Sequence, residues 1–237
     1  MKNEVTKLDE PILSGANRRE EGRDYYEWYM WHWAGVDPAT GHGLWWTDET
    51  MTETTTNVSD AERFYTGKSA TPSAFGGINT SLSYKNFDLS AQIVFVLDKY
   101  IYDVAGFVLD GDGRYTPRGT HVFGFENRWT TPGQEALYPQ HFWGNNTKSN
   151  QKYQTRYLYD ATYARLRDLT LSYTFGQSVV DKLDISSLKV FIKGNNLLTW
   201  VRDKENLHLD PEASVSGLVN GLQPKSKTIT FGVNVGF

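Results

Sequence analysis

The sequence contains no cysteine, which excludes disulfide bonds and thiolate metal sites. It has no apolar run of roughly 18 residues, the length that a membrane-spanning helix needs. The net charge of -4 argues against a protein that binds nucleic acid electrostatically. Residues 1–10 have neither the apolar core nor the small-residue cleavage site of a signal peptide. As a complete protein, the chain is therefore expected to stay in the cytoplasm.

Catalytic and metal-binding patterns are also missing. The five histidines show no spacing typical of metal ligands, and no glycine-rich phosphate loop follows a strand. Residues 110–113 begin like a calcium loop, but Arg114 stands at the next ligand position and Tyr115 at the place of the required glycine. We therefore predict a protein that is not an enzyme and that holds no cofactor or metal.

The most regular pattern that is present is the alternation of apolar and polar residues at 226–237. A period of two predicts a β-strand, because successive side chains of a strand point to opposite faces. An apolar face opposite a polar face is typical of a transmembrane β-barrel strand, and equally of the last strand of a soluble sandwich or barrel. The apolar face carries Ile229, Phe231, Val233, Val235 and Phe237.

The same alternation recurs along the chain. Around the tight connection at Asn86 it predicts a β-hairpin. The stretch 24–36 is rich in aromatic residues, and its two faces are nearly equally apolar. We include it as a strand because its composition favours β-structure. About six membrane strands are thus predicted, at 24–36, 74–85, 87–98, 163–175, 187–200 and 226–237.

The lengths of the connections distinguish the two interpretations. The connections at Asn86 and at 176–187 are short, whereas 98–160 and 201–225 are long. Membrane barrels have short periplasmic turns and long outer loops, and a soluble sandwich has no reason to sort its loops in this way. We predict an all-β fold: an antiparallel transmembrane β-barrel segment with long outer loops. The barrel is incomplete, since the smallest closed barrels have about eight strands.

Several ordered motifs resemble the carboxyl-terminal part of SusC/RagA-type TonB-linked outer-membrane proteins. These motifs span essentially the whole chain. They are the turn Gly35-Val-Asp-Pro-Ala-Thr-Gly41, the hairpin strand that begins Pro72-Ser-Ala-Phe-Gly-Gly77, the loop strings Arg128-Trp-Thr-Thr-Pro-Gly133 and Tyr138-Pro139, the strands 163–175 and 190–200, Asp210-Pro-Glu212 and the terminal aromatic residue.

This resemblance implies a function and a set of partners. Residues 1–237 are expected to be the carboxyl-terminal portion of a TonB-dependent receptor barrel in the outer membrane, without the signal peptide, the plug and the TonB box. The chain would be part of an importer of glycan or peptide oligomers. Its expected partners are a SusD-like surface lipoprotein, the rest of the barrel and plug, the TonB complex through the plug, and outer-membrane lipid. A soluble β-rich carbohydrate-binding domain is the alternative.

Three groups of residues are candidates for functional roles. Aromatic rings in the long loop, Trp129, Tyr138 and Trp143, would stack on sugar rings or pack the loop against itself or a partner. The inward lysines Lys189 and Lys193 would line a substrate path, or simply be solvated in an aqueous lumen. The terminal aromatic residue resembles the signal by which the assembly machinery recognises outer-membrane barrels. That role falls here on Phe231, Val233, Val235 and Phe237.

Overall fold

The computed structural model describes residues 3–115, 120–144, 149–204, 209–212, 215–221 and 224–237. The chain divides into two compact units. We call residues 72–98, 161–211 and 223–237 the sheet unit, and residues 1–71, 99–160 and 212–222 the loop unit. Among the described residues, no helix is both long and apolar enough to cross a membrane.

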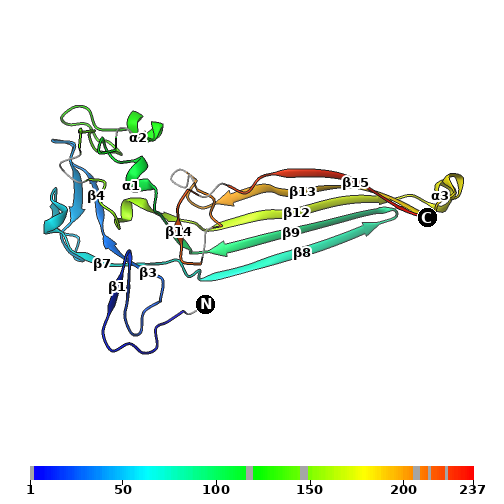
Figure 1. Ribbon diagram of the computed structural model, residues 1–237, viewed down its shortest axis with the longest axis horizontal. Helices are drawn as coiled ribbons and strands as arrows, with labels where there is room; N and C mark the ends of the chain where they lie inside the picture. Colours follow the sequence, from blue (N-terminus) through cyan, green and yellow to red (C-terminus); the bar gives the residue numbers. More distant parts are fainter. Residues whose placement is uncertain (1–2, 116–119, 145–148, 205–208, 213–214, 222–223) are drawn as a thin grey trace. The chain divides into compact units, whose positions relative to one another are not determined.

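The sheet unit is built on one antiparallel sheet of five long strands in the order β15-β13-β12-β9-β8 (Figure 1). The β12–β13 connection carries the short helices α3 (Gln177–Val180) and η4 (Asp181–Leu183). Within the described residues, β8 and β15 are the two edges, so the sheet is open. The strands are β8 (Ala74–Tyr84), β9 (Phe87–Leu97), β12 (Tyr163–Thr174), β13 (Ser187–Val201) and β15 (Thr228–Gly236).

The connections are sorted by length at the two ends of the sheet, as the sequence predicts. The β8–β9 turn, the connection with α3 and the C-terminus lie at one end (Figure 1). There the backbone N–H of Thr174 donates to the carbonyl of Asn86, and that of Ser186 donates to the carbonyl of Gly236. The residues that follow β9 and β13 leave from the opposite end. All five long strands were predicted from alternation alone.

One expected strand is wrong. Residues 24–36 form two short strands of the loop unit, β3 (Glu27–Trp31) and β4 (Trp33–Val36), which belong to different small sheets. On one face of β3, Trp28 and Met30 are fully buried in a core with Tyr102 and Tyr157. The other face is half-buried, and the guanidinium groups of Arg18 and Arg63 lie over its rings Tyr29 and Trp31. Protein side chains thus pack on both faces, which explains why the two faces are nearly equally apolar. Among the described residues, the long sheet therefore has five strands, where about six were predicted.

The loop unit contains short strands and helical turns around two small aromatic cores. It also holds β7, which was not predicted from the sequence. The elements are β1 (Ile12–Ser14), β2 (Asn17–Arg19), β3, β4, β5 (Gly43–Trp46), β6 (Thr54–Thr55), η1 (Val58–Asp60), β7 (Arg63–Ser69), β10 (Tyr100–Asp103), α1 (Gly106–Leu109), α2 (Val122–Glu126), η3 (Thr155–Tyr157), β11 (Leu158–Asp160) and β14 (Leu218–Val219). With few helical residues and mostly antiparallel pairing, the chain is all-β, as predicted.

Candidate membrane interface and ligand-contacting residues

One face of the long sheet is apolar across all five strands. The register aligns Tyr84 with Phe87, Phe87 with Tyr173, and Tyr173 with Val190, so the apolar side chains form continuous rows. These side chains are far more exposed than a protein core allows: Leu82 is 65% and Phe231 is 76% exposed. Large contiguous apolar surfaces of this kind mark interfaces with lipid or with other protein.

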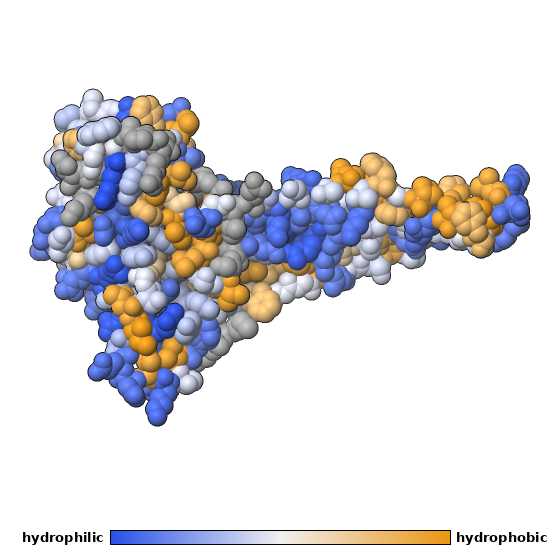
Figure 2. All heavy atoms as spheres, viewed as in Figure 1, coloured by the Kyte–Doolittle hydropathy of each residue, from blue (hydrophilic) through white to orange (hydrophobic). Residues whose placement is uncertain are grey.

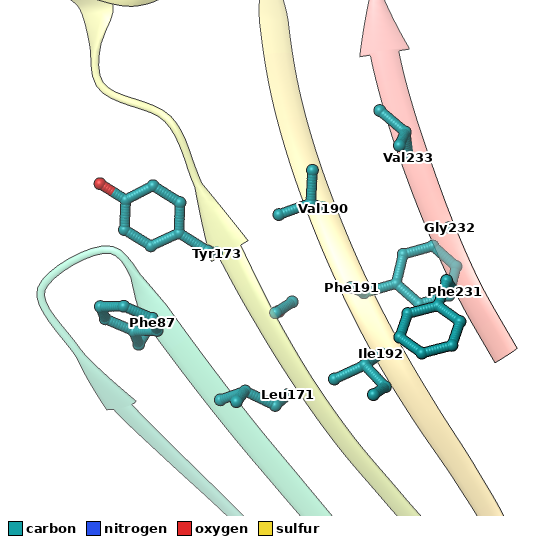
Figure 3. A pocket seen from close by; sticks show the side chains of 10 residues that line it. Phe87, Leu171, Tyr173, Val190, Phe191, Ile192, Phe231, Gly232 and Val233 are labelled. Carbon is teal, nitrogen blue, oxygen red and sulfur yellow. The ribbon is translucent and has the colours of Figure 1, made fainter. Parts of the chain in front are cut away.

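The apolar rows converge on a hollow of about 590 Å³ near the end that carries the C-terminus. Hydrophobic residues gather toward this end in the view of Figure 2. In the close-up of Figure 3, Phe87, Leu171, Ile192 and Phe231 come from four neighbouring strands. Three of the four residues predicted to carry the assembly signal lie on β15, at an edge of the sheet, and Phe237 follows it with 99% of its side chain exposed.

The opposite face is polar and carries ion pairs. The Nζ of Lys189 lies 3.3 Å from a carboxylate oxygen of Asp88, and the Nζ of Lys193 lies 3.0 Å from Asp168. Hydrophilic residues cover the middle of the sheet in Figure 2. Both predicted lysines are on the predicted face, each half-exposed and paired with a carboxylate. A role in a substrate path stays a prediction for both.

A buried ion pair lies on the polar face, at the end of the sheet that carries the long connections. Arg165 donates from its Nη2 to both carboxylate oxygens of Asp210, at 2.9 Å each, and both side chains are almost fully buried. Asp210 also accepts the backbone N–H of Lys225 at 2.8 Å. This pair therefore holds two parts of the β13–β15 connection against β12. Asp210 belongs to the predicted motif Asp210-Pro-Glu212, but no role was predicted for it.

The three predicted loop aromatics have different surroundings. Trp129 is 9% exposed; its ring lies over Gly41, and its Nε1 donates to the carbonyl of Pro38 at 2.9 Å. Tyr138 is partly buried, and the Arg156 guanidinium lies 5.1 Å from its ring centre. Trp143 is 82% exposed. Trp129 thus packs against the turn at 35–41, while Trp143 has a ring free to meet a ligand.

A buried polar network organises the long connection around Tyr138. The Arg156 guanidinium donates to both carboxylate oxygens of Asp112, at 2.7 and 3.0 Å, and the Ser149 hydroxyl donates to one of them at 2.7 Å. Gln154 donates to the Ser149 carbonyl and accepts from the indole of Trp45, both at 2.8 Å. This part of residues 98–160 is therefore fixed from within, although the sequence predicts only an irregular loop.

No protein-family model matches the chain. Two curated proteins of Formosa agariphila are similar to it. TonB-dependent receptor P3 is 27% identical over 191 residues, which are 76% of this chain and 18% of that protein. TonB-dependent receptor P26 is 28% identical over 181 residues, which are 70% of this chain and 17% of that protein. The chain thus spans less than a fifth of the length of these relatives.

Two solved structures of the RagAB peptide importer contain a similar chain. The structure of the open-open state matches with a TM-score of 0.82 and 24% identity, over 99% of this chain and 25% of that chain. The structure of the closed-closed state matches with a TM-score of 0.78 and 25% identity, over 99% of this chain and 26% of that chain. The predicted SusC/RagA resemblance is confirmed.

Among the described residues, no group of three or more His, Asp or Glu side chains is arranged to hold a metal ion. The described histidines have other surroundings. The ring of His32 stacks on Phe64 at 3.6 Å, and burial lowers its pKa to about 4. His208 lies outside the described residues.

Proposed function

We propose that this SusC/RagA-type chain forms part of the barrel wall of an outer-membrane, TonB-dependent importer. The observation that carries the proposal is the open five-stranded sheet, apolar on one face and polar on the other, with its connections sorted by length. In lipid, an antiparallel sheet satisfies its backbone groups only when its edges are paired. The edges β8 and β15 therefore pair with the rest of the barrel, which would be supplied by the other parts of a longer receptor.

The apolar face contacts outer-membrane lipid, and the polar face with Lys189 and Lys193 lines the lumen, where the plug lies. Residues 1–237 are the carboxyl-terminal portion of the receptor, and the TonB complex acts on it through the plug. The names of the similar proteins support a TonB-dependent receptor. A soluble carbohydrate-binding domain would not leave such a wide apolar face exposed.

The substrates are oligomers, either of sugars or of amino acids. The similar RagAB structures are of a peptide importer, which favours peptides. A SusD-like lipoprotein covers the outer side. Trp143 and Tyr138 are the aromatic candidates for contact with the substrate or with this lipoprotein. Trp129 supports them by packing the loop.

The test is the topology of the intact receptor in whole cells. The short connections at Asn86 and α3 face the periplasm, and residues 99–160 face the outside. Asn86 and Glu135 are both exposed, so a cysteine at either position is accessible on its own side. An impermeant maleimide should label Glu135→Cys on whole cells and Asn86→Cys only after the outer membrane is opened. Labelling of Asn86→Cys alone on whole cells would invert the topology, and a receptor found in the soluble fraction would contradict the function.

A further inference from the structure

A polar groove of about 510 Å³ lies entirely within the loop unit, between β2, β3 and β7 and the segment around residues 48–50. Its lining combines three arginines with four carboxylates and two tyrosines. The arginines are Arg18, Arg23 and Arg63. Some of its charged groups have an ion-pair partner and others do not, and this difference points to a ligand.

Two of the arginines are already paired. The Nε of Arg18 lies 3.7 Å from Glu20, and the Nη1 of Arg23 lies 3.3 Å from Glu27. Each guanidinium also lies over a tyrosine ring, Arg23 at only 3.6 Å from the centre of Tyr65. These groups form a rigid, charge-balanced wall.

Arg63 is different. Its guanidinium stacks on Trp31 at 3.9 Å from the ring centre and donates from Nη1 to the Gly15 carbonyl at 2.9 Å. Among the described residues, no carboxylate lies within ion-pairing distance of it. The side chain is half-buried, and this loss of water lowers its pKa. A half-buried charge without a counter-charge is unfavourable, and a planar fork held by stacking is well suited to a carboxylate.

The carboxylates of the groove define the rest of the ligand. Asp48 accepts hydrogen bonds from the backbone and the hydroxyl of Thr50, at 2.8 and 2.6 Å. Glu49 and Glu62 are exposed and have no ion pair among the described residues. These two carboxylates repel a polyanion such as an acidic polysaccharide, but they attract an ammonium group. A ligand that carries both a carboxylate and a cationic group fits this lining.

We propose that this groove binds a zwitterionic oligopeptide, whose carboxylate pairs with Arg63 and whose ammonium group lies toward Glu49 and Glu62. A neutral glycan fits less well, since Tyr29 and Tyr65 already have guanidinium groups over their rings. The inference rests on the proposed function, because it names the substrate class of the same importer. No functional residue was predicted in this groove from the sequence.

The experiment is calorimetric binding to the intact detergent-solubilised receptor. The probes are tetra-alanine with free termini, its C-terminal amide, its N-acetyl form, and tetragalacturonate as the polyanion. The free peptide should bind roughly ten-fold or more tighter than the amide, since a charge-assisted bidentate pair is lost in the amide. Acetylation should weaken binding as well. Equal binding of the free acid and the amide, or tighter binding of tetragalacturonate, would overturn the proposal.

Variants of Arg63 test whether this residue causes the preference for the free acid over the amide. Arg63→Gln should remove the preference for the free acid, and Arg63→Lys should retain part of it, because the charge remains without the planar fork. Arg128→Gln is the matched control, since Arg128 also stacks on an aromatic ring of the loop unit, 3.7 Å from the centre of Phe125. An unchanged preference in Arg63→Gln contradicts the site. If this variant does not fold, a full preference in Arg63→Lys contradicts it instead.

Uptake separates the site from the proposed function. Import of labelled tetra-alanine by cells with and without a working TonB complex tests the importer. Import with no acid-over-amide preference overturns the groove alone. Normal acid-selective binding without any TonB-dependent import overturns the proposed function and leaves the groove as a binding site.

Discussion

The ring of Phe191 lies over Gly232 of the neighbouring strand, in the space that a Cβ at position 232 would fill. Figure 3 shows the ring beside this glycine. A second pair of the same kind occurs on the other face, where the ring of Phe95 covers Gly76, its partner across the β8–β9 pair. A glycine in a strand interior often marks such a close approach. In both pairs an aromatic ring covers backbone that the missing side chain leaves open.

This relationship predicts that Gly232 tolerates no side chain. Gly232→Ala should destabilise the intact receptor by roughly 1–3 kcal/mol, because the new methyl group overlaps the Phe191 ring. Gly77→Ala is the matched control in the same sheet, since the nearest atom to a Cβ there is the Ile93 carbonyl oxygen at 3.5 Å. The measurement is the temperature at which the barrel loses its compact form on a gel. Equal midpoints for the two variants would show that the Phe191 ring simply moves aside.

The buried pair of Asp112 and Arg156 predicts a large effect of removing one charge. Asp112→Asn should destabilise the loop unit by roughly 3–5 kcal/mol, because it leaves the Arg156 guanidinium buried without its counter-charge. Asp88→Asn provides the control. Asp88 and Lys189 are 47% and 40% exposed, and an exposed ion pair contributes little to stability because water screens it.

Protease sensitivity of whole cells reports this difference, since residues 99–160 face the outside in the proposed topology. Asp112→Asn should be cut much faster than the parent, and Asp88→Asn should not. Adding Arg156→Met to Asp112→Asn should restore resistance in part. Equal resistance of all variants would rule out the network as the element that orders this segment.

Burial separates the roles of the two loop tryptophans. Trp129→Ala should lower the free energy of unfolding by roughly 3–5 kcal/mol, because it removes a buried ring from its place over Gly41. The thermal midpoint should fall accordingly. Trp143→Ala should leave the midpoint unchanged and weaken binding of the imported oligomer. Thermal unfolding and calorimetric binding of both variants are the measurements. A normal affinity of Trp143→Ala would remove it from the candidate substrate contacts.

The long strands were predictable because each has one apolar and one polar face. Apolar and polar residues therefore alternate along the sequence with a period of two. The bulge at Arg167 was not predicted. The register shifts between Leu166 and Asp168, and this shift puts Leu166 and Leu169 on the same face although three positions separate them. It also puts Arg165 on the polar face, where it meets Asp210. A strict period of two cannot detect such an insertion.

The candidate site was harder to predict, because its contacts join distant parts of the sequence. Alternation alone put Lys189 and Lys193 on the polar face. It carried no information that Trp129 packs on Gly41, or that Arg63 stacks on Trp31. Both relationships depend on how short strands fold onto one another in the loop unit. The available signal was the equal apolarity of the two faces of 24–36, which fits short strands with protein side chains packed on both faces.

The stability of the loop unit should depend on pH through His32. Its pKa in the folded state is about 4, against 6.5 for an unperturbed histidine, mainly because burial disfavours the charged form. As the pH falls from about 6.5 to about 4, the unfolded state takes up a proton that the folded state does not. Stability is therefore lost over this window, by at most roughly 1.4 kcal/mol per pH unit, and the contribution is constant above it.

The variant His32→Phe keeps an aromatic ring against Phe64 but cannot take up a proton. Thermal midpoints of the receptor at about pH 7 and about pH 5 should differ less for this variant than for the parent. Carboxylates that titrate lower contribute equally to both proteins. The same pH dependence in the two proteins would show that His32 is accessible to protons in the folded state.

We expect Phe237 to be needed for assembly of the receptor but not for the stability of the assembled receptor. It follows the edge strand β15 and is 99% exposed, so its ring contributes little to the packing of this sheet. Even a fully buried ring would contribute only about 1.5–3 kcal/mol, a small part of the stability of a large barrel. Deletion of Phe237 should therefore lower the amount of receptor that reaches the surface, whereas receptor that does assemble should unfold at the normal temperature.

Tyr84→Ala is the matched control for the deletion of Phe237, since it removes another exposed ring, 68% accessible, from the same end of the sheet. If both variants assemble at the parent level, Phe237 is an ordinary interfacial residue. If both fail equally, the loss follows from the missing apolar surface, and no signal is read from the last residue.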